Sequence, residues 1–356
     1  MGKSRVRLSE AVAQYLAQRA ADCAPTTVKA DRDVLRRLVA TLGDRPLHLL
    51  QPGDLTNAYY GPNGFAQQHR TRDRKDRPPV SATTLNYYRS RHRAFFDFCA
   101  RTWPSHVRVD LMRDIRKATT ERKERYQPGP NDLREMLGLA ADPRDRALLA
   151  TVGMTGLRRG DLLALRLRDV DLATMVITTT ISKSRTVEQV PLPEELVDEL
   201  KTWRTAYARA LARVLQGDDY LFPASTGNRY SWRVVDGINV RENVAGTWDP
   251  TKPMTKPERV VQDVLRRMGR DPRGEGLHTL RRGFGRWLYD REIANGHEYA
   301  GRLVQAALHH KNFATTEGYL GISAERQRLD ASVRGRPWFP TAPTEARVVP
   351  LTPKAT

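Results

Sequence analysis

His278-Thr279-Leu280-Arg281 opens a run of apolar residues at helical spacing, which predicts a helix over 278–294. His278 and Arg281 stand three residues apart, so they share one face of that helix and lie near the positive end of its dipole. Two cationic donors at a helix N-terminus make a site for an anion.

A second polar group follows in Ala307-Leu308-His309-His310, at the end of a helix predicted over 298–309, and Tyr319 stands nine residues after His310. A pair of histidines can bind a metal ion, but no carboxylate or cysteine lies at ligand spacing here. Tyr319 taken alone could also be a core aromatic whose hydroxyl is capped.

Two further residues lie where a local pattern breaks. Arg158 lies in Thr155-Gly156-Leu157-Arg158-Arg159-Gly160-Asp161, between two predicted helices, and taken alone it could cap a helix or pair with the nearby aspartate. Lys183 lies between two β-rich runs, 175–181 and 186–192, which predict a β-hairpin. A lysine at a hairpin tip is usually only solvated.

The order of these residues resembles the tyrosine recombinase family, which comprises phage-type integrases and Xer-like site-specific recombinases. The family has an arginine, a lysine in a hairpin, His-x-x-Arg, a histidine and then a nucleophilic tyrosine. A single match would carry little weight, but six in the same order are specific. The resemblance implies six catalytic residues: Arg158, Lys183, His278, Arg281, His310 and Tyr319.

One position departs from the family's pattern. Where the family usually has Leu-Gly-His, this chain has Leu308-His309-His310, so His309 replaces an expected glycine. The bulkier residue could alter the turn or offer a competing imidazole. The spacing to Tyr319 favours His310 over His309 as the family's second histidine.

These residue types suit the transfer of a DNA strand to a tyrosine. Arg158 and Arg281 would stabilise the negative charge that builds on the non-bridging oxygens of the phosphate. Tyr319 has an ordinary pKa near 10, so it needs a base, and His278 is the natural proton acceptor. Lys183 would protonate the departing 5′-oxygen.

His310 would bind the phosphate and help to position the tyrosine. The product would be a 3′-phosphotyrosine with a free 5′-hydroxyl. This linkage conserves the bond energy, so rejoining needs neither ATP nor metal. The sequence accordingly has no phosphate-cradling Gly-x-x-x-x-Gly-Lys-Ser/Thr and no His-Glu-x-x-His. We therefore expect no cofactor and no metal.

The resemblance implies a site-specific recombinase that acts on paired half-sites of double-stranded DNA, as in DNA integration or excision. Strand exchange would pass through a Holliday junction in a homotetramer, with residues 323–333 as the helix that docks on a neighbouring copy. Two alternatives stay open: a type IB topoisomerase-like enzyme that relaxes DNA, and a non-catalytic DNA-binding regulator. The intact Tyr319 argues against the regulator. The target DNA sequence cannot be read from composition.

The pattern along the chain predicts a mainly α-helical protein with a small β-hairpin or sheet, an α+β fold. We expect a helical domain over 1–120, a linker over 121–130, a mixed α/β domain over 131–335 and an extended tail with prolines over 336–356. The resemblance implies a core-binding domain that clamps DNA, followed by the catalytic domain. An irregular section is expected over 224–254.

The charge of the chain indicates a polyanionic partner. Lys and Arg total 60 against 41 Asp and Glu, a net charge of +19, and residues 1–127 carry 25 basic and 13 acidic residues of that total. A solvated face or an RNA-binding surface would also explain this excess. The helix predicted after Ser81 has one apolar stripe and, on another face, three arginines that could bind phosphate: Arg89, Arg91 and Arg93.

Cysteine content and hydropathy limit where the protein acts. Two cysteines, Cys23 and Cys99, are too few for a disulfide scaffold or a Cys-rich metal site. No run of about 18 apolar residues occurs, and residues 1–7 lead into a polar helix pattern. We expect a cytoplasmic protein with no membrane partner, acting at a bacterial nucleoid or encoded by a phage or mobile element.

Overall fold

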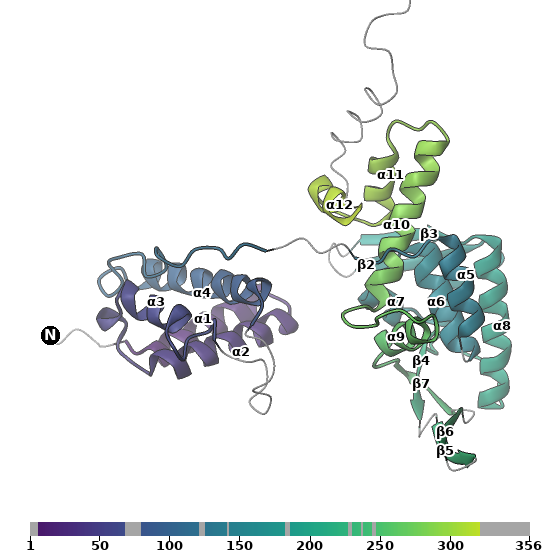
Figure 1. Ribbon diagram of the computed structural model, residues 1–356, viewed down its shortest axis with the longest axis horizontal. Coiled ribbons are helices and arrows are strands. Elements are labelled where there is room, and N and C mark those ends of the chain that lie inside the picture. Colours follow the sequence, from purple (N-terminus) through teal and green to yellow (C-terminus); the bar gives the residue numbers. More distant parts are fainter. Residues whose placement is uncertain are drawn as a thin grey trace, which may run out of the picture. The chain divides into compact units, whose positions relative to one another are not determined.

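The structure, a computed structural model, describes residues 6–67, 80–120, 125–140, 142–181, 186–226, 230–235, 238–243 and 247–320. It divides into two compact units, Met1–Lys123 and Glu124–Thr356 (Figure 1). None of the helices in the described ranges is long and apolar enough to cross a membrane.

The first unit is helical in its described residues. Its elements are α1 (Leu8–Asp22), α2 (Pro25–Leu42), a 3-10 turn (Leu47–Leu49), α3 (Pro52–Tyr60) and α4 (Ala82–Thr102). Ser81 caps α4 because its hydroxyl accepts a hydrogen bond from the backbone N–H of Thr84 at 3.3 Å. The inward faces of the four helices form one apolar cluster around Leu35 and Phe95.

The arginines on α4 are tied to groups within this unit. Asp31, buried in α2, forms ion pairs with Arg19 of α1 and Arg91 of α4, each at 3.1 Å. Arg89 donates to the carbonyl oxygen of Ile115 at 2.6 Å. Arg93 pairs with Asp110 at 2.7 Å. The three arginines expected to bind phosphate thus have partners within this unit, on segments that the α4 sequence alone cannot reveal, and their binding of phosphate stays a prediction.

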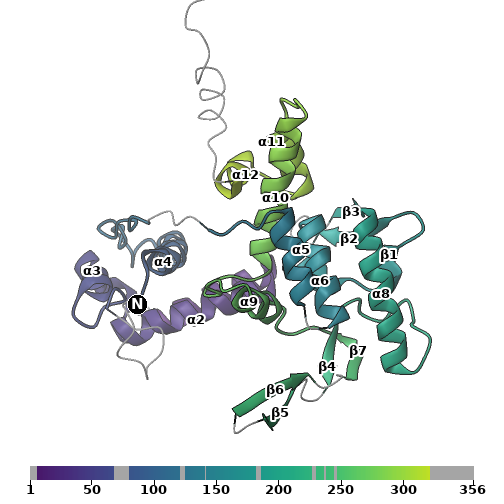
Figure 2. The ribbon, with the colours of Figure 1, turned by 45° about the vertical axis from the view of Figure 1, so that its right-hand side comes forward.

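The second unit is built around α6. The helices are α5 (Pro130–Leu139), α6 (Pro143–Thr155), α7 (Arg159–Ala164), α8 (Glu194–Leu211), α9 (Glu258–Arg267), α10 (Leu277–Ala294), α11 (Ala300–Ala307) and α12 (Phe313–Leu320). α6 contacts α5, α8, α9 and α10, and Figure 2 shows α5, α6 and α8 side by side. Because Leu148, Leu149 and Val152 of α6 are fully buried, this helix forms the centre of the core.

The predicted hairpin is part of a small antiparallel sheet. The strands are β1 (Val170–Asp171), β2 (Val176–Ile181) and β3 (Thr186–Pro191), in the order β1-β2-β3. The register pairs Thr179 with Glu188 and Ile181 with Thr186. Lys183 lies within 182–185, outside the described residues.

Residues 224–254 are more regular than the sequence pattern indicates. They contribute β4 (Pro223–Thr226) paired with β7 (Thr247–Pro253), and β5 (Tyr230–Val235) paired with β6 (Ile238–Asn243), all antiparallel. Prolines within β7 hide it from a strand search, since proline cannot donate to a ladder. In the sequence, the Asp236-Gly237 dipeptide between β5 and β6 is typical of a β-hairpin.

The last described elements form a separate small core. This core buries Leu288 of α10, Val304 of α11, Leu308 at the end of α11 and Leu320 of α12. α12 is a helix that apolar periodicity did not predict. Residues 323–333 and the tail 336–356 lie outside the described residues. Within the described residues the mainly helical α+β fold with small sheets is confirmed.

Candidate active site

A short turn after α11 holds two arginines through its carbonyl oxygens. Nη2 of Arg158 donates to the carbonyl oxygens of Leu308 at 3.1 Å and His309 at 2.7 Å. Nη2 of Arg281 donates to the same Leu308 oxygen at 2.5 Å. Arg158 precedes α7 and Arg281 lies in the second turn of α10, so this turn brings together two arginines that are far apart in the sequence.

Two residues with positive φ shape the surroundings of the arginines. His309 has φ +47°, in the left-handed region that glycine adopts at little cost. Gly156, at the end of α6, has φ +65°, and its carbonyl oxygen accepts a hydrogen bond from Nη1 of Arg281. The expected glycine at position 309 is thus explained by backbone conformation. Histidine adopts this conformation at a cost of roughly 1 kcal/mol.

His310 contacts Arg281 through one ring nitrogen, and its ring also packs against the tyrosine. Its Nε2 lies 3.5 Å from Nη2 of Arg281, and its Nδ1 lies 3.0 Å from Oγ1 of Thr316. The imidazole meets the ring of Tyr319 edge to face, with 5.3 Å between the ring centroids. Because an arginine can only donate, Nε2 accepts from Arg281, which leaves the proton on Nδ1 for Thr316.

Arg281 is one of the most deeply buried charges among the described residues, with 2% of its surface exposed. Burial lowers the pKa of Arg281 to about 10, while Tyr319 opposes that change and Arg158 adds to it. At neutral pH the guanidinium therefore keeps its charge. A buried, fixed cation of this kind stabilises a nearby anion strongly, because no solvent has to reorganise around it.

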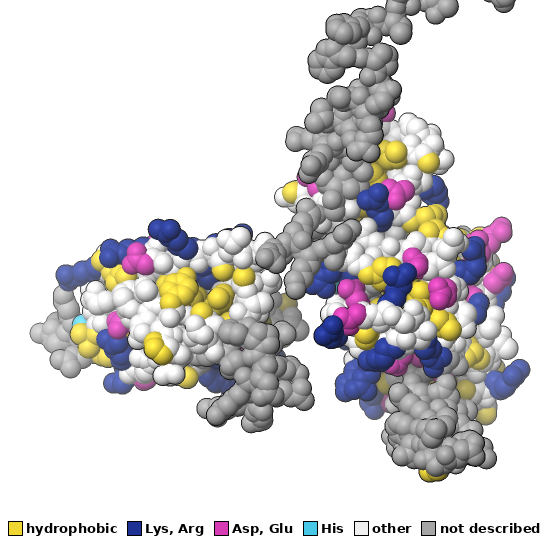
Figure 3. Space-filling model, in the orientation of Figure 1, with side chains coloured by type: hydrophobic (Ala, Val, Ile, Leu, Met, Phe, Trp, Pro, Cys, Tyr) yellow, Lys and Arg dark blue, Asp and Glu magenta, His cyan; other side chains and the backbone are white. Residues whose placement is uncertain are grey.

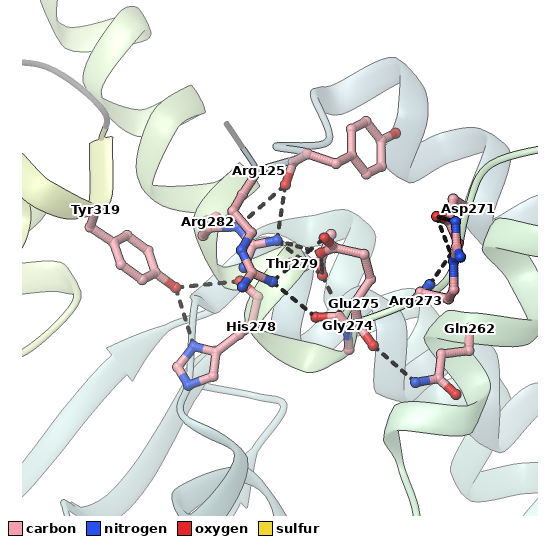
Figure 4. Close-up of polar contacts among 12 residues, drawn as sticks. Arg125, Gln262, Asp271, Arg273, Gly274, Glu275, His278, Thr279, Arg282 and Tyr319 are labelled. Atoms are coloured by element: carbon pink, nitrogen blue, oxygen red, sulfur yellow. Dashed lines mark hydrogen bonds and ion pairs between the residues drawn. The ribbon is translucent and has the colours of Figure 1, made fainter. Parts of the chain in front are cut away.

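The hydroxyl of Tyr319 faces His278 (Figure 4). It lies 3.4 Å from Nδ1 of His278 and donates to the backbone carbonyl oxygen of the same residue at 3.4 Å. His278 is exposed at the second position of α10, and Tyr319 comes from α12. The two residues therefore meet through the packing of α12 against α10.

Two opposing effects act on the pKa of Tyr319. Burial raises the pKa of Tyr319 to about 12, whereas the charges of Arg281, Arg282 and Arg158 hold it lower than burial alone would. The tyrosine is therefore a neutral phenol at neutral pH, lying beside three cations. Such a hydroxyl becomes a nucleophile when a neighbouring group removes its proton.

Five of the six predicted site residues lie together. Four of them, Arg158, His278, Arg281 and His310, lie around the fifth, Tyr319. Lys183 falls outside the described residues, so its place relative to this group stays a prediction.

Sequence reasoning missed residues that support the site. Thr316 is fully buried and holds His310, and Gln305 donates to the carbonyl oxygen of His310 at 2.9 Å. Asn312 accepts a hydrogen bond from the backbone N–H of Ala314 at 2.9 Å at the start of α12. An asparagine before a short helix is an N-cap signal that could have predicted α12.

Comparisons with known proteins identify related sequences and structures. Residues 129–326, more than half of the chain, match the phage integrase family model. Tyrosine recombinase XerD of Pseudomonas putida is 30% identical over 200 residues, which are 55% of this chain and 55% of that protein. A tyrosine recombinase of Pseudothermotoga lettingae is 23% identical over 258 residues, 72% of this chain and 76% of that protein.

Solved structures share the fold. A lambda integrase dimer bound to a COC′ core site superposes with a TM-score of 0.61 at 16% identity, covering 95% of this chain and 80% of that one. The Tn1549 transposon integrase in complex with transposon right end DNA gives 0.62 at 15% identity, covering 92% and 99%. The family match and the shared fold lead to one conclusion: the chain belongs to the phage integrase family of tyrosine recombinases.

Proposed function

We propose that this protein is a site-specific DNA recombinase in which Tyr319 attacks a DNA phosphodiester. The convergence of Arg158, Arg281 and His310 near Tyr319, with His278 at its hydroxyl, carries the proposal. The products of cleavage are a 3′-phosphotyrosine and a free 5′-hydroxyl, so one P–O bond forms as another breaks. Attack by a 5′-hydroxyl from a second duplex then gives a recombinant strand.

Arg158 and Arg281 bind the scissile phosphate. Nη1 of Arg158 is buried and has no hydrogen-bond partner within the described part of the chain, although Nη2 has two. A buried guanidinium nitrogen without a partner is costly unless a ligand supplies an acceptor. A non-bridging phosphate oxygen is such an acceptor, and the guanidinium fork suits it.

His278 accepts the proton of Tyr319 during attack. The separation of 3.4 Å is longer than a proton-transfer hydrogen bond, as is common before substrate binds. His310 lies beside Arg281, and it would donate to the phosphate from Nε2 once that nitrogen carries a proton and no longer accepts from Arg281. Lys183, which follows strand β2, gives a proton to the departing 5′-oxygen, because an alkoxide is a poor leaving group.

The first unit, together with basic residues of the second, holds the duplex backbone. Figure 3 shows Lys and Arg side chains gathered on the second unit around α9. The exposed cations in and beside α9, over residues 252–273, are Lys252, Lys256, Arg259, Arg266, Arg267, Arg270 and Arg273. Contacts of this kind to phosphates are indifferent to sequence and weaken with salt.

Recombination needs paired copies of the protein. A lambda integrase has been solved as a dimer bound to a COC′ core site and as a tetramer bound to a Holliday junction. We infer the same course for this chain: a homotetramer assembled on paired half-sites of intracellular DNA. Residues 323–333 are our candidate for the helix that docks on a neighbouring copy.

The test uses Tyr319→Phe on a nicked suicide substrate that traps the covalent adduct. We expect wild-type protein to form the adduct and Tyr319→Phe to form none, with DNA affinity unchanged because only one hydroxyl is lost. An undiminished adduct in Tyr319→Phe would refute the nucleophile. Wild-type protein that relaxes supercoiled DNA but never joins two duplexes would favour a topoisomerase-like activity.

A further inference from the structure

Residues Arg125–Pro128, which we call the strap, lead the chain into the second unit and lie against α10. The carbonyl oxygen of Tyr126 accepts hydrogen bonds from Nε and Nη2 of Arg282, at 3.3 and 3.2 Å. A Cβ atom at Gly283 would lie 2.2 Å from the carbonyl oxygen of Pro128. Only glycine therefore allows the strap to approach α10 so closely.

Arg282 connects the strap to the first turn of α10 through hydrogen bonds. Its Nη2 donates to the carboxylate of Glu275 and to Oγ1 of Thr279, the latter at 3.3 Å. Oγ1 of Thr279 in turn donates to Glu275 at 2.5 Å and accepts from the backbone N–H of Gly276 at 3.1 Å. Figure 4 shows this network beside His278, which lies between Gly276 and Thr279 in the chain.

The strap also reaches the tyrosine. Nε2 of Gln127 donates to the backbone carbonyl oxygen of Tyr319 at 3.5 Å. The charge of Arg282 offsets part of the rise that burial causes in the pKa of Tyr319. Both partners of the hydroxyl–imidazole pair are thus connected to the same four residues, one through Arg282 and the other through Gln127.

We propose that Arg282 is a positioning residue which, held by the strap, sets the first turn of α10 so that His278 meets the hydroxyl of Tyr319. The proposal rests on the proposed function and adds control of proton transfer. A change of a few tenths of an ångström in the 3.4 Å separation decides whether the proton can move.

The test is Arg282→Lys, which keeps the charge near Tyr319 but loses the planar fork that joins Tyr126, Glu275 and Thr279. We expect the single-turnover cleavage rate at saturating DNA to fall about tenfold, because small misplacements at a reacting centre are costly. DNA affinity should stay within about twofold. Arg286→Gln is the matched control: it lies one turn further along α10, pairs with Asp290 at 2.7 Å and should change neither quantity.

A double-mutant cycle separates positioning from general structural damage. If Arg282 acts through His278, Arg282→Lys should slow cleavage less than about twofold in a His278→Ala background. The pH–rate profile of Arg282→Lys should also lose the limb that His278→Ala loses. An equal tenfold loss in both backgrounds, or an unchanged profile at lower amplitude, would overturn the proposal.

Failure of this inference is distinguishable from failure of the proposed function. Wild-type protein and Arg286→Gln must form the Tyr319 adduct for the recombinase proposal to stand. The inference about Arg282 stands or falls on the relative rates of the variants in that same assay. Thermal melting of Arg282→Lys checks that the variant folds, and Glu275→Gln, which breaks the same network from the other side, should give the same cleavage defect.

Discussion

Nη2 of Arg158 and the carbonyl oxygen of His309 lie 2.7 Å apart, and they meet because the backbone of His309 adopts φ +47°. The family's pattern has a glycine at this position. Its backbone conformation, which directs the carbonyl oxygen toward Arg158, explains that preference better than a lack of room for a side chain does. A residue that resists the left-handed region would turn this oxygen away from Arg158. The guanidinium would then lose one of its two anchors.

The first prediction compares His309→Gly with His309→Val. Glycine accepts φ +47° freely, so the cleavage rate should stay within about twofold of wild type, whereas a β-branched residue is strained there and the rate should fall about tenfold or more. Single-turnover cleavage at saturating DNA measures both. Equal rates for the two variants would show that the backbone at this position does not hold Arg158.

The second prediction concerns Arg158→Lys. The guanidinium anchors Nη2 on two carbonyl oxygens and leaves Nη1 for phosphate, a division that a single ammonium nitrogen cannot reproduce. We expect cleavage to slow about 10²-fold, the usual cost of one lost donor to a developing charge. DNA affinity, measured at fixed salt, should barely change. A rate near that of wild type would contradict the phosphate clamp.

Sequence reasoning predicted best where local pattern and geometry coincide. The hairpin over 175–192 and the helix that begins at Leu277 both lie where the β-rich runs and the helical spacing of apolar residues predict them. It could not predict that Asp31 would engage two arginines, since ion pairs depend on segments distant in the chain. The strand β7 was hidden by its own prolines, and only tertiary packing makes it a strand.

The same limit applies to the candidate site. The order of six residues named the participants, but the hydrogen bonds of the Leu308–His310 turn appear only once α11 is packed against α10. Thr316 supports His310 from within α12, and a threonine in a short polar segment carries no sign of that role. The sequence could therefore nominate candidate site residues, but not the residues that support them.

The third prediction concerns Lys183 as general acid. Lys183→Ala should cleave ordinary DNA about 10²-fold more slowly, because the 5′-oxygen leaves without a proton. Replacing that bridging oxygen by sulfur gives a better leaving group and should restore most of the rate to Lys183→Ala. Arg158→Lys is the control, since sulfur at the leaving position should not rescue a lost phosphate contact. The role of Lys183 as acid is untenable if sulfur rescues neither variant or both equally.

The fourth prediction follows from a buried histidine in the first unit. His92 of α4 is fully buried, with Nδ1 2.7 Å from the hydroxyl of Tyr59. Burial lowers the pKa of His92 to about 3, against a smaller opposing effect of a backbone contact with Val34. The folded protein therefore keeps this imidazole neutral at pH values where the unfolded chain protonates it.

Because the pKa of His92 is lower in the folded state, its contribution to stability is complete above about pH 6.5 and is lost as the pH falls toward 3. At pH 5 the loss should be about 2 kcal/mol, from roughly 1.5 pH units at 1.36 kcal/mol each. Amide hydrogen exchange in α4, corrected for intrinsic rates, measures this loss between pH 7 and pH 5. His92→Gln removes the titrating group and should flatten the pH dependence, whereas His48→Gln, at an exposed position of the same unit, should leave it as in wild type. If His92→Gln retains the full pH dependence, another group in the first unit is responsible for it.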